Sequence, residues 1–454
     1  MNAMKETSKM EHTKIQFLNH ASVVVICDEI SILTDPWFSG DAFHKGWNLL
    51  FENLHDDILS VLSTITHIWI SHEHPDHFSV LFFKKYKEVL IQAGVTILFQ
   101  ETTDKRVVSF LRANKFNVLE IPVDRKIKIN DEIDLSCIRD GFYDSALLIE
   151  HKGEKILNLN DCEVNNVKRA LEVFRRTGKV DVLLSQFSYA AWKGGKANKT
   201  WRKNSAAEKI ETLILQVDIF SPKILIPFAS FIYFSNELNS YLNDSINTLE
   251  DVSYAFKDKD VFIATMRPGD VLENPKYLDV QSAVEFWNSR FLECSKKRFN
   301  KYQSKTINEL EELFFKYSNR IEINNNITLM RILRFLSPIR IFHPVTIELL
   351  DIDTIVEFDY LKKTFVTSNN EPLLRMHSES LHFLFNNTFG FDTLTINGCF
   401  EEGVSGGFSI AVKSLSIENL NNLGFSMDIK MLFRLGIIKL FLIRLYRVLR
   451  KIES

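Results

Sequence analysis

The chain has 454 residues, of which 45% are hydrophobic and 25% charged, and a formal net charge of −3 at pH 7. This balance is typical of an ordinary folded protein and excludes a dedicated, strongly basic nucleic-acid binder. The length exceeds a usual single hydrophobic core, so we expect two domains. The cysteines are scattered and never spaced as Cys-x-x-Cys, which fits a reducing cytoplasm and excludes an obvious zinc ribbon. Residues 1–13 are polar, lack the apolar core of a signal peptide and are expected to form a disordered tail.

Three short β-rich runs come first along the chain, at residues 14–18, 22–27 and 30–34. Turn residues separate them, so the pattern predicts an antiparallel meander. Asp35 directly follows the third run. The chain also contains a histidine-rich motif at residues 72–77, which is described below. At a strand end beside that motif, the Asp35 carboxylate is expected to orient a metal-binding histidine. The alternative is that Asp35 is a turn residue before Pro36.

The stretch richest in metal-ligand side chains is His72-x-His74-x-Asp76-His77, which follows an apolar β-rich run and precedes a segment of helical spacing at 78–92. Side chains two residues apart on an extended strand end point the same way, so His72 and His74 are expected to bind one metal. Asp76 is expected to cap the following helix, and Asp76 and His77 are expected to face the same metal or a second one nearby. Imidazole and carboxylate ligands together suit zinc, iron or manganese.

Beyond the motif, β-rich runs alternate with helical segments up to about residue 275, and two sheets flanked by helices are the natural packing for that order. One run, at residues 155–160, is apolar and ends in Asp161. A carboxylate at a strand end can bridge two metals through its two oxygens, so Asp161 is a candidate ligand. The alternative is that Asp161 caps a helix at 163–177.

Several of these segments resemble the metallo-β-lactamase superfamily across about residues 14–275, namely Asn19-His20-Ala21-Ser22, Thr34-Asp35-Pro36-Trp37, His72-x-His74-x-Asp76-His77 and Asn160-Asp161. A second set looks like the CMP-N-acetylneuraminate hydroxylase family outside its Rieske part, namely Asp35-Pro36-Trp37-Phe38, Ala42-Phe43, Gly46-Trp47, Asp161-Cys162, Pro227-Phe228-Ala229 and Arg267-Pro268-Gly269. The resemblance implies an α/β fold, with an αββα sandwich that carries the site at one edge. It also implies one or two transition-metal ions (iron or zinc, with manganese possible), bound by His72, His74, Asp76, His77 and Asp161.

The sequence departs from the superfamily pattern at two positions. Members with two metals normally add one histidine between the motif and the bridging aspartate, and another after a late strand. This chain has no histidine at 78–150 or at 152–342. Candidate replacements are Asp140, Tyr143 and Asp144 for the first position, Ser230 for the second, and His343, His377 and His382 from farther along the chain. A site richer in oxygen than a di-zinc hydrolase favours iron or manganese, and a site without functional metal is the alternative.

Two enzyme classes and one binding class remain open. The hydroxylase resemblance implies a metal centre that activates dioxygen and hydroxylates an anionic, nucleotide- or phosphate-bearing substrate. Because the chain has no pair of Cys-x-His motifs, the electrons are expected to come from a separate protein. The alternative is a hydrolase of the lactonase or phosphodiesterase type, in which a metal-bound hydroxide attacks and Asp76 is the catalytic residue that holds the water or accepts its proton. The third class is a binding protein with a degenerate metal site.

Two cationic segments favour an anionic substrate. Residues 192–203 are rich in lysine and arginine around a Gly-Gly pair, so Lys193 and Lys196 are candidate phosphate contacts. A solvated loop is the alternative for that segment. Arg267 is a third candidate contact, with a simple turn as its alternative.

Residues 276–430 are expected to form a helical and α+β accessory domain. A charged helical pattern leads into predicted strands at 346–350, 393–397 and 408–412. Residues 431–454 predict a basic amphipathic helix that is too interrupted by charges to span a bilayer. Its apolar face is expected to pack on the protein or on a second copy in a homo-oligomer; the alternative is peripheral attachment to anionic lipid.

Overall fold

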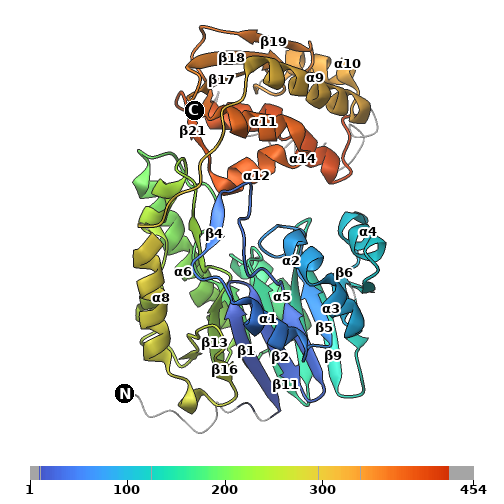
Figure 1. The fold of residues 1–454 in the computed structure, drawn as a ribbon, viewed down its shortest axis with the longest axis vertical. Coiled ribbons are helices and arrows are strands. Elements are labelled where there is room, and N and C mark those ends of the chain that lie inside the picture. Colours follow the sequence, from blue (N-terminus) through green and yellow to red (C-terminus); the bar gives the residue numbers. More distant parts are fainter. Residues whose placement is uncertain (1–9, 11, 124, 295, 338, 429–454) are drawn as a thin grey trace, which may run out of the picture. The chain divides into compact units, whose positions relative to one another are not determined.

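The protein is described by a computed structural model, shown in Figure 1. It describes residues 10, 12–123, 125–294, 296–337 and 339–428. The predicted helix at 431–454 lies outside the described residues and stays a prediction. Most of the predicted tail at 1–13 also lies outside them, but Met10 is buried and Thr13 begins the first strand, so the tail is shorter than predicted. The chain divides into two compact units, each with its own core.

The first unit contains two seven-stranded sheets, and the first of them has the strand order β16-β1-β2-β3-β5-β6-β7. In that order its strands span Val271–Leu272, Thr13–Asn19, Ser22–Cys27, Ile30–Thr34, His67–Ile70, Thr96–Gln100 and Asn117–Ile121. β1, β2 and β3 pair antiparallel, which confirms the predicted meander. β3, β5, β6 and β7 pair parallel.

The second sheet has the strand order β15-β13-β12-β11-β10-β9-β8. In that order its strands span Phe262–Ile263, Ile224–Phe228, Val182–Gln186, Glu154–Asn160, Asp144–His151, Ile133–Asp140 and Ile127–Lys128. The half from β8 to β11 is antiparallel, and the half from β11 to β15 is parallel. A separate two-stranded ribbon pairs β4 (Trp47–Leu49) with β14 (Ile232–Phe234).

Alternating side chains explain why the first sheet is buried on both faces. Val23 and Val25 of β2 belong to a hydrophobic cluster that extends across the second sheet and includes Leu135 of β9. Val24, between them, belongs to a separate cluster with Phe83 of α2 (Val80–Lys85). Successive side chains of a strand point to opposite faces, so one face of the sheet meets the second sheet and the other meets helices.

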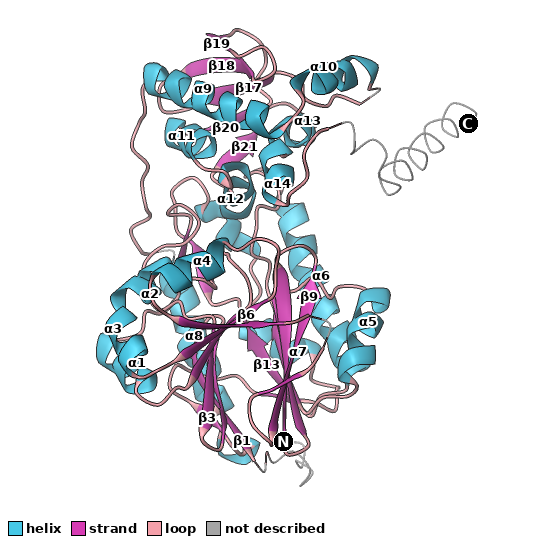
Figure 2. Ribbon diagram, turned by 90° about the vertical axis from the view of Figure 1, so that its right-hand side faces the viewer, coloured by secondary structure: helices cyan, strands magenta, loops and turns pink. Residues whose placement is uncertain are grey.

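Helices cover the outer faces of both sheets, and Figure 2 shows the resulting layers edge on. On the side of the first sheet lie α1, α2, α3 and α4, of which α1, α3 and α4 span His55–Leu62, Lys87–Gln92 and Arg106–Ala113. On the side of the second sheet lie α5, α6 and α7, which span Val167–Thr177, Lys199–Phe220 and Leu249–Ala255. The first unit is therefore the expected αββα sandwich.

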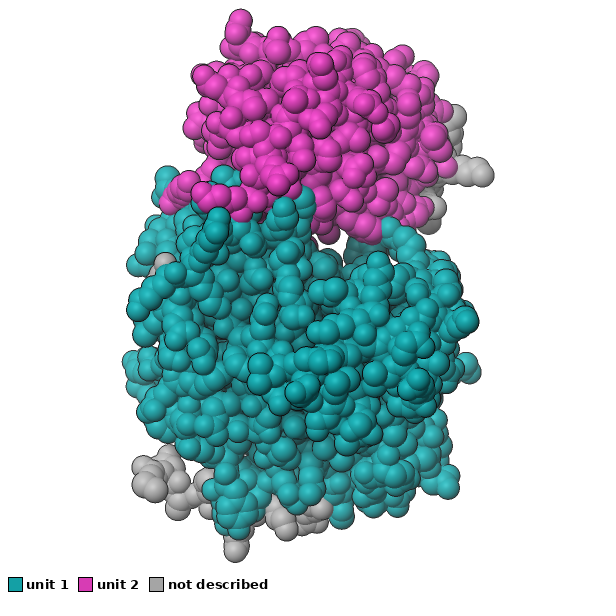
Figure 3. Space-filling model, in the orientation of Figure 1, with its two compact units in different colours: residues 1–193, 197–300 teal, residues 194–196, 301–454 magenta. Residues whose placement is uncertain are grey.

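The first unit also includes α8 (Val280–Cys294), although the predicted boundary lies after residue 275. Trp287 of α8 is fully buried and donates its Nε1–H to the Met266 carbonyl at 2.8 Å. Its ring lies 4.1 Å from that of Phe231, centroid to centroid. Because this helix completes the core of the sandwich, the first unit ends at residue 300, as Figure 3 distinguishes by colour.

The second unit comprises residues 194–196 and the chain from 301 onward, and it combines a small sheet with helices. The sheet order is β19-β18-β17-β20-β21, with strands at Thr364–Thr367, Thr354–Asp359, Val345–Leu349, Leu374–Met376 and Phe400–Glu402. The helices are α9 (Ile307–Asn324), α10 (Ile327–Leu336), α11 (Ser378–Asn386), α12 (Gly390–Asn397), α13 (Gly407–Leu415) and α14 (Ile417–Asn422).

Three local predictions are wrong. The predicted strands at 393–397 and 408–412 lie within helices α12 and α13. The predicted helix at 78–92 is two short helices, α2 and α3, separated at Tyr86.

Among the helices of the described chain, none has the length and apolar character that crossing a membrane requires.

Candidate metal centre

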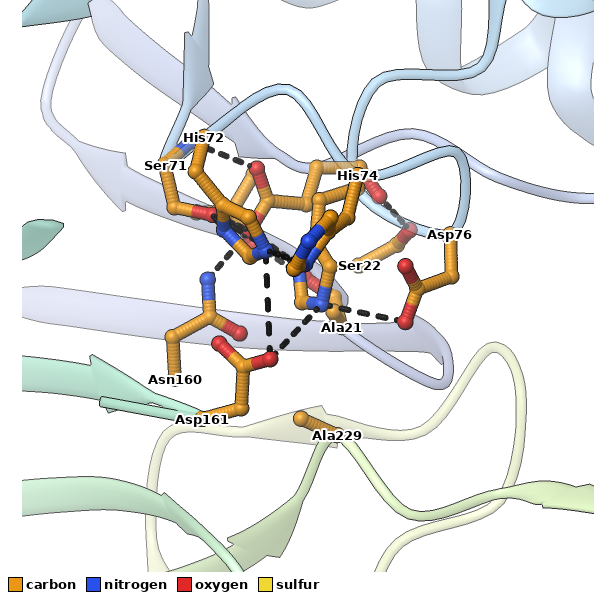
Figure 4. Close-up of polar contacts among 12 residues, drawn as sticks. Ala21, Ser22, Ser71, His72, His74, Asp76, Asn160, Asp161 and Ala229 are labelled. Atoms are coloured by element: carbon orange, nitrogen blue, oxygen red, sulfur yellow. Dashed lines mark hydrogen bonds and ion pairs between the residues drawn. The ribbon is translucent and has the colours of Figure 1, made fainter. Parts of the chain in front are cut away.

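Strand direction brings several loops to one edge of the sandwich. β1, β3 and β5 run the same way in the first sheet, and their ends lead into His20, Asp35 and the histidine motif. In the second sheet β11 leads into Asp161 and β13 into Ala229, while the antiparallel β10 begins with Asp144 at the same edge. Figure 4 shows the side chains from both sheets gathered at this edge.

The backbone at this edge is strained at four positions without glycine. The φ angles of His20, Asp35, Asn160 and Ala229 are 21°, 36°, 58° and 48°. Non-glycine residues rarely adopt positive φ, and such a conformation costs on the order of 1–3 kcal/mol each. It persists where surrounding contacts enforce it, and it is common at functional sites.

His72 and His74 lie side by side on the loop after β5, next to Asp161 in Figure 4. His72 is fully buried, and its Nε2 is 2.8 Å from His74 Nδ1. His72 Nδ1 lies 2.9 Å from Ser71 Oγ, which leaves Nε2 directed at the site. The same Nε2 is 3.6 Å from Asp144 Oδ1, so His72, His74 and Asp144 form one group of candidate ligands.

A second group forms around Asp76. His77 Nε2 lies 3.2 Å and His20 Nε2 lies 3.4 Å from Asp76 Oδ2, and all three residues are buried. Asp161 Oδ2 lies 3.5 Å from His77 Nε2 and 3.9 Å from His72 Nε2, so it contacts a histidine of each group. That position is the one expected of a carboxylate that bridges two metals.

Asp35 fixes the orientation of these loops from a fully buried position. Its carboxylate accepts hydrogen bonds from Ser71 N and Oγ at 2.8 Å each, from His77 Nδ1 at 3.0 Å and from Asn160 Nδ2 at 2.5 Å. Because an ionised carboxylate only accepts, His77 donates through Nδ1 and presents Nε2 to Asp76 and Asp161. The structure thus contains the contact through which Asp35 is predicted to orient a histidine.

The crowded charges shift the pKa of several groups. Burial lowers the pKa of His72. Burial also opposes the charge on His77, but the carboxylates of Asp76 and Asp161 outweigh it and raise its pKa well above the usual value. Burial, aided by the charge of Asp161, raises the pKa of Asp144 to about 7. Burial would raise the pKa of Asp161 as well, but attraction to the histidines depresses it.

The side chains fit one or two transition-metal ions. His20 Nδ1, Asp76 Oδ1 and Asp161 Oδ1 are buried and have no hydrogen-bond partner among the described residues. A buried acceptor without a partner costs about 1–3 kcal/mol, and a bound cation removes that cost for the two carboxylates. Imidazole nitrogens with carboxylate oxygens are the ligands that suit zinc, iron and manganese.

Of the candidate replacements for the first absent histidine, Asp144 joins a ligand group and Asp140 does not. Asp140 is buried, but its two oxygens accept hydrogen bonds from the Glu163 amide at 2.5 Å and from Arg169 Nε at 2.8 Å. Asp140 therefore joins β9 to α5, and these contacts argue against its role as a ligand. Tyr143 lies on the turn between β9 and β10, where its backbone carbonyl accepts a hydrogen bond from Gln100 Nε2, and its role as a ligand stays a prediction.

The candidates for the second absent histidine lie elsewhere. Ser230 Oγ accepts hydrogen bonds from the amides of Phe187 and Ser188 at 3.1 Å each, so it stabilises a loop. The three remote candidates belong to the second unit and to none of the ligand groups found in the described chain; they are His343, His377 and His382.

The structure also excludes the expected helix cap at Asp76 and the alternative helix cap at Asp161. α2 begins at Val80, and Ser79 rather than Asp76 caps it by accepting a hydrogen bond from the Phe82 amide. α5 is capped by Asn166, so capping does not account for Asp161. Helix capping therefore explains neither Asp76 nor Asp161, and both belong to groups of candidate ligands.

The three cationic candidates for substrate contact have different surroundings. Lys193 belongs to the first unit, whereas Lys196 belongs to the second, and the Lys196 amide donates to the Glu401 carboxylate at 3.1 Å. Arg267 forms an ion pair with Asp270 at 3.2 Å. Their roles in substrate binding stay predictions.

His20 is the ligand candidate that sequence reasoning missed. It belongs to the segment that carries the superfamily resemblance, but no metal role is predicted for it. The meander already contained a signal, because its first and third strands run the same way and therefore end at one edge. A histidine directly after the first strand thus lies at the same edge as Asp35, and His20 groups with Asp76 and His77.

Comparisons with known proteins agree with this geometry. Residues 14–185 match the family described as a β-lactamase superfamily domain. Cytidine monophosphate-N-acetylneuraminic acid hydroxylase of Mus musculus is 28% identical over 280 residues, which are 57% of this chain and 47% of the relative. The Homo sapiens protein named as its inactive counterpart is also 28% identical over 280 residues, 57% of this chain and 54% of the relative.

The chain spans about half the length of these curated relatives. Among solved structures, CmlA, a diiron β-hydroxylase from Streptomyces venezuelae, aligns with a TM-score of 0.41 and 16% identity over 58% of this chain and 55% of that one. The match to the domain family covers the meander, the histidine motif and Asp161. The chain therefore contains a β-lactamase superfamily domain, and its fold is the metallo-β-lactamase fold.

Proposed function

We propose that the protein is a metal-dependent oxygenase that hydroxylates an anionic, nucleotide- or phosphate-bearing substrate. The observation that carries this proposal is the pair of ligand groups with Asp161 between them, which provides for two ions in one site. The name of the Mus musculus relative, a hydroxylase of cytidine monophosphate-N-acetylneuraminic acid, supports the reaction class, whereas the Homo sapiens relative is named as inactive. The carboxylates in the ligand groups favour iron or manganese over zinc.

Each ligand group has a defined part in this proposal. His72, His74 and Asp144 would hold one ion and His20, Asp76 and His77 would hold the other, while Asp161 lies near a histidine of each group. When bound, the ions supply the activation of dioxygen. Asp35 keeps Nε2 of His77 directed at the site through the hydrogen bond to Nδ1.

The reaction needs electrons that the site itself does not store. Conversion of a C–H bond to C–OH takes one oxygen atom of O₂, while the other leaves as water after two electrons and two protons are added. The cysteines at positions 27, 137, 162, 294 and 399 are all buried, and no ligand group found in the described chain includes one. We therefore assign the electrons to a separate electron-transfer protein.

A hydrolase is the second candidate, and one observation favours it. The pKa of Asp76 lies well below its usual value, because attraction to His77 and a hydrogen bond from His20 outweigh burial. Its Oδ1 is buried without a partner among the described residues. An ionised carboxylate with a vacant oxygen suits a residue that holds an attacking water or accepts its proton.

Metal analysis and oxygen uptake distinguish the candidates. The protein is purified without oxygen, its metals are quantified, and it is mixed with cytidine monophosphate-N-acetylneuraminic acid and a reduced electron-transfer protein. Two iron or manganese ions per chain with substrate-dependent oxygen uptake are expected. Hydrolysis of ester or phosphodiester substrates with zinc and without oxygen would establish the second candidate. Absence of metal from protein purified in metal-supplemented buffer would leave the binding-protein alternative.

A further inference from the structure

A lysine that carries no predicted role lies at the edge of the sheet that holds Asp161. Lys209 of α6 donates from Nζ to Gln186 Oε1 at 2.6 Å. Gln186 is buried at the end of β12, and its Nε2 donates to the Ala229 carbonyl at 3.3 Å. The amide of Gln186 therefore orients its oxygen toward Lys209, which ties the ammonium to the ends of β12 and β13.

Strand register brings this ammonium next to the ligand groups. Asn160 of β11 pairs with Ser185 of β12, so Asp161 and Gln186 each follow a member of one pair on adjacent parallel strands. Neighbouring strands are ~4.8 Å apart, and Figure 4 shows Asp161 and Ala229 at the same edge. Lys209 is therefore attached one strand away from the candidate bridging carboxylate.

The surroundings of Lys209 do not neutralise its charge. Among the described residues it has no carboxylate within ion-pair distance, and its hydrogen-bond partner is the neutral Gln186. Burial lowers the pKa of Lys209, while Asp161 raises it and Lys193 lowers it again, so two lysines lie within electrostatic range of each other. An ammonium has three donor hydrogens, and a part-buried one that uses a single neutral acceptor is costly unless an anion completes it.

We propose that Lys209, together with Lys193, binds the anionic group of the substrate beside the metal centre, and that Gln186 positions Lys209 for this contact. This inference rests on the proposed function, because it names the side chains that select its anionic substrate. Lys209 forms charge-assisted hydrogen bonds to the phosphate or carboxylate of the substrate. Lys193 adds a second positive charge to the same subsite.

The test measures the binding of inorganic phosphate and of cytidine 5′-monophosphate to the full chain by equilibrium dialysis at low ionic strength, with and without metal. Lys209→Met keeps the aliphatic stem and removes the charge, and it is expected to weaken binding about tenfold or more. Lys209→Arg restores part of the affinity because it restores the charge. Lys168→Met, on the exposed side of α5, is the matched control and binds as the unaltered protein does.

Metal content, measured on the same samples, separates this inference from the proposed function. Unchanged metal content with weakened phosphate binding in Lys209→Met supports the subsite. Equal phosphate affinity in Lys209→Met and the unaltered protein overturns it, whatever the metal content. If Lys209→Met does not fold, Lys193→Met decides: its phosphate affinity falls about threefold if the subsite exists and is unchanged if it does not. If the unaltered protein binds no metal, and Lys209→Met still weakens phosphate binding, the proposed oxygenase function is contradicted but the anion subsite is supported.

Discussion

The two units of the molecule bury ionisable groups in opposite ways. In the second unit, Arg334 donates to both oxygens of Asp359 at 2.7 and 2.8 Å, and Arg320 donates to Glu418 at 2.8 Å. In the first unit, the ligand groups gather histidines around aspartates, and Asp76 and Asp161 each keep an oxygen without a described partner. In the second unit each of these charges is paired with one opposite charge. In the first unit several histidines and carboxylates share one cluster, and we call such charges pooled.

The difference separates charges that serve the fold from charges that await a ligand. A buried ion pair is compensated by its own partner, so removing one member destabilises the protein without affecting function. A pool of histidines and carboxylates with vacant oxygens is compensated only when a cation joins it. Unpartnered carboxylate oxygens gathered with histidines in one place therefore indicate a ligand site better than burial or charge alone.

Loss of the histidine pair is expected to have the largest effect. The double variant His72→Ala/His74→Ala removes both nitrogens of the first ligand group, so the ion of that group is lost at every metal concentration and metal content falls from two ions per chain to at most one. Elemental analysis after purification in metal-supplemented buffer measures this. His382→Ala, in the second unit, is the control and keeps the metal content of the unaltered protein. Unchanged metal in the double variant would show that the metal site lies elsewhere.

Loss of the bridging carboxylate is expected to have an intermediate effect. Asp161→Ala removes the side chain that contacts a histidine of each group, so both ions bind more weakly and at most one stays tightly held, although each remaining group still offers three ligands. The same elemental analysis measures this, together with the metal concentration needed for half occupancy. Two tightly held ions in this variant would exclude Asp161 as a ligand.

Breaking an ion pair of the second unit is expected to lower stability but not metal content. Asp359→Ala leaves the half-buried Arg334 without its partner, which lowers the free energy of unfolding by up to about 3 kcal/mol. Denaturant unfolding measures the loss, and the exposed Glu371→Ala, within about 0.5 kcal/mol of the unaltered protein, is the control. A parallel fall in metal content would contradict the distinction between paired and pooled charges.

The smallest effect is expected at Asp140, which belongs to the first unit but is paired like the charges of the second. Asp140→Asn weakens its contact with Arg169 and lowers the free energy of unfolding by about 1 kcal/mol, with metal content unchanged. Asp144→Asn, at the other end of the same β-hairpin turn, is the comparison and weakens metal binding. Equal metal loss in both variants would mean that Asp140 also is a ligand.

The elements that the sequence predicted well are those whose local pattern and tertiary role agree. The meander and the strand before His72 alternate or run apolar, and their sheet is buried on both faces, so the pattern was sufficient. The predicted strands at 393–397 and 408–412 contain β-branched and aromatic residues, but packing in the second unit makes both segments helical. The predicted domain boundary wrongly places α8 outside the sandwich. The burial of Trp287 depends on its contact with Phe231, which is distant in the sequence.

The candidate site divides along the same line. His72, His74, Asp76 and His77 were recognisable because their spacing is local, and Asp161 because it ends an apolar strand. Asp140 and Asp144 could not be told apart, since both flank one turn and only Arg169, from another element, distinguishes them. The position of His20 at the site depends on the direction of β1, and that of Lys209 depends on the packing of α6 against the sheet. The spacing of residues along the sequence encodes neither.

The hydrogen bonds on Asp35 have a consequence for motion. They join the loops after β3, β5 and β11, which belong to both sheets, so the sheets cannot separate at this edge without breaking them together. Backbone amides near the site should exchange their hydrogens only in large cooperative openings, whereas those of the short outer strands β15 and β16 exchange by fraying. A bound ion would then leave slowly, at a rate set by the opening of the sandwich rather than by its own affinity.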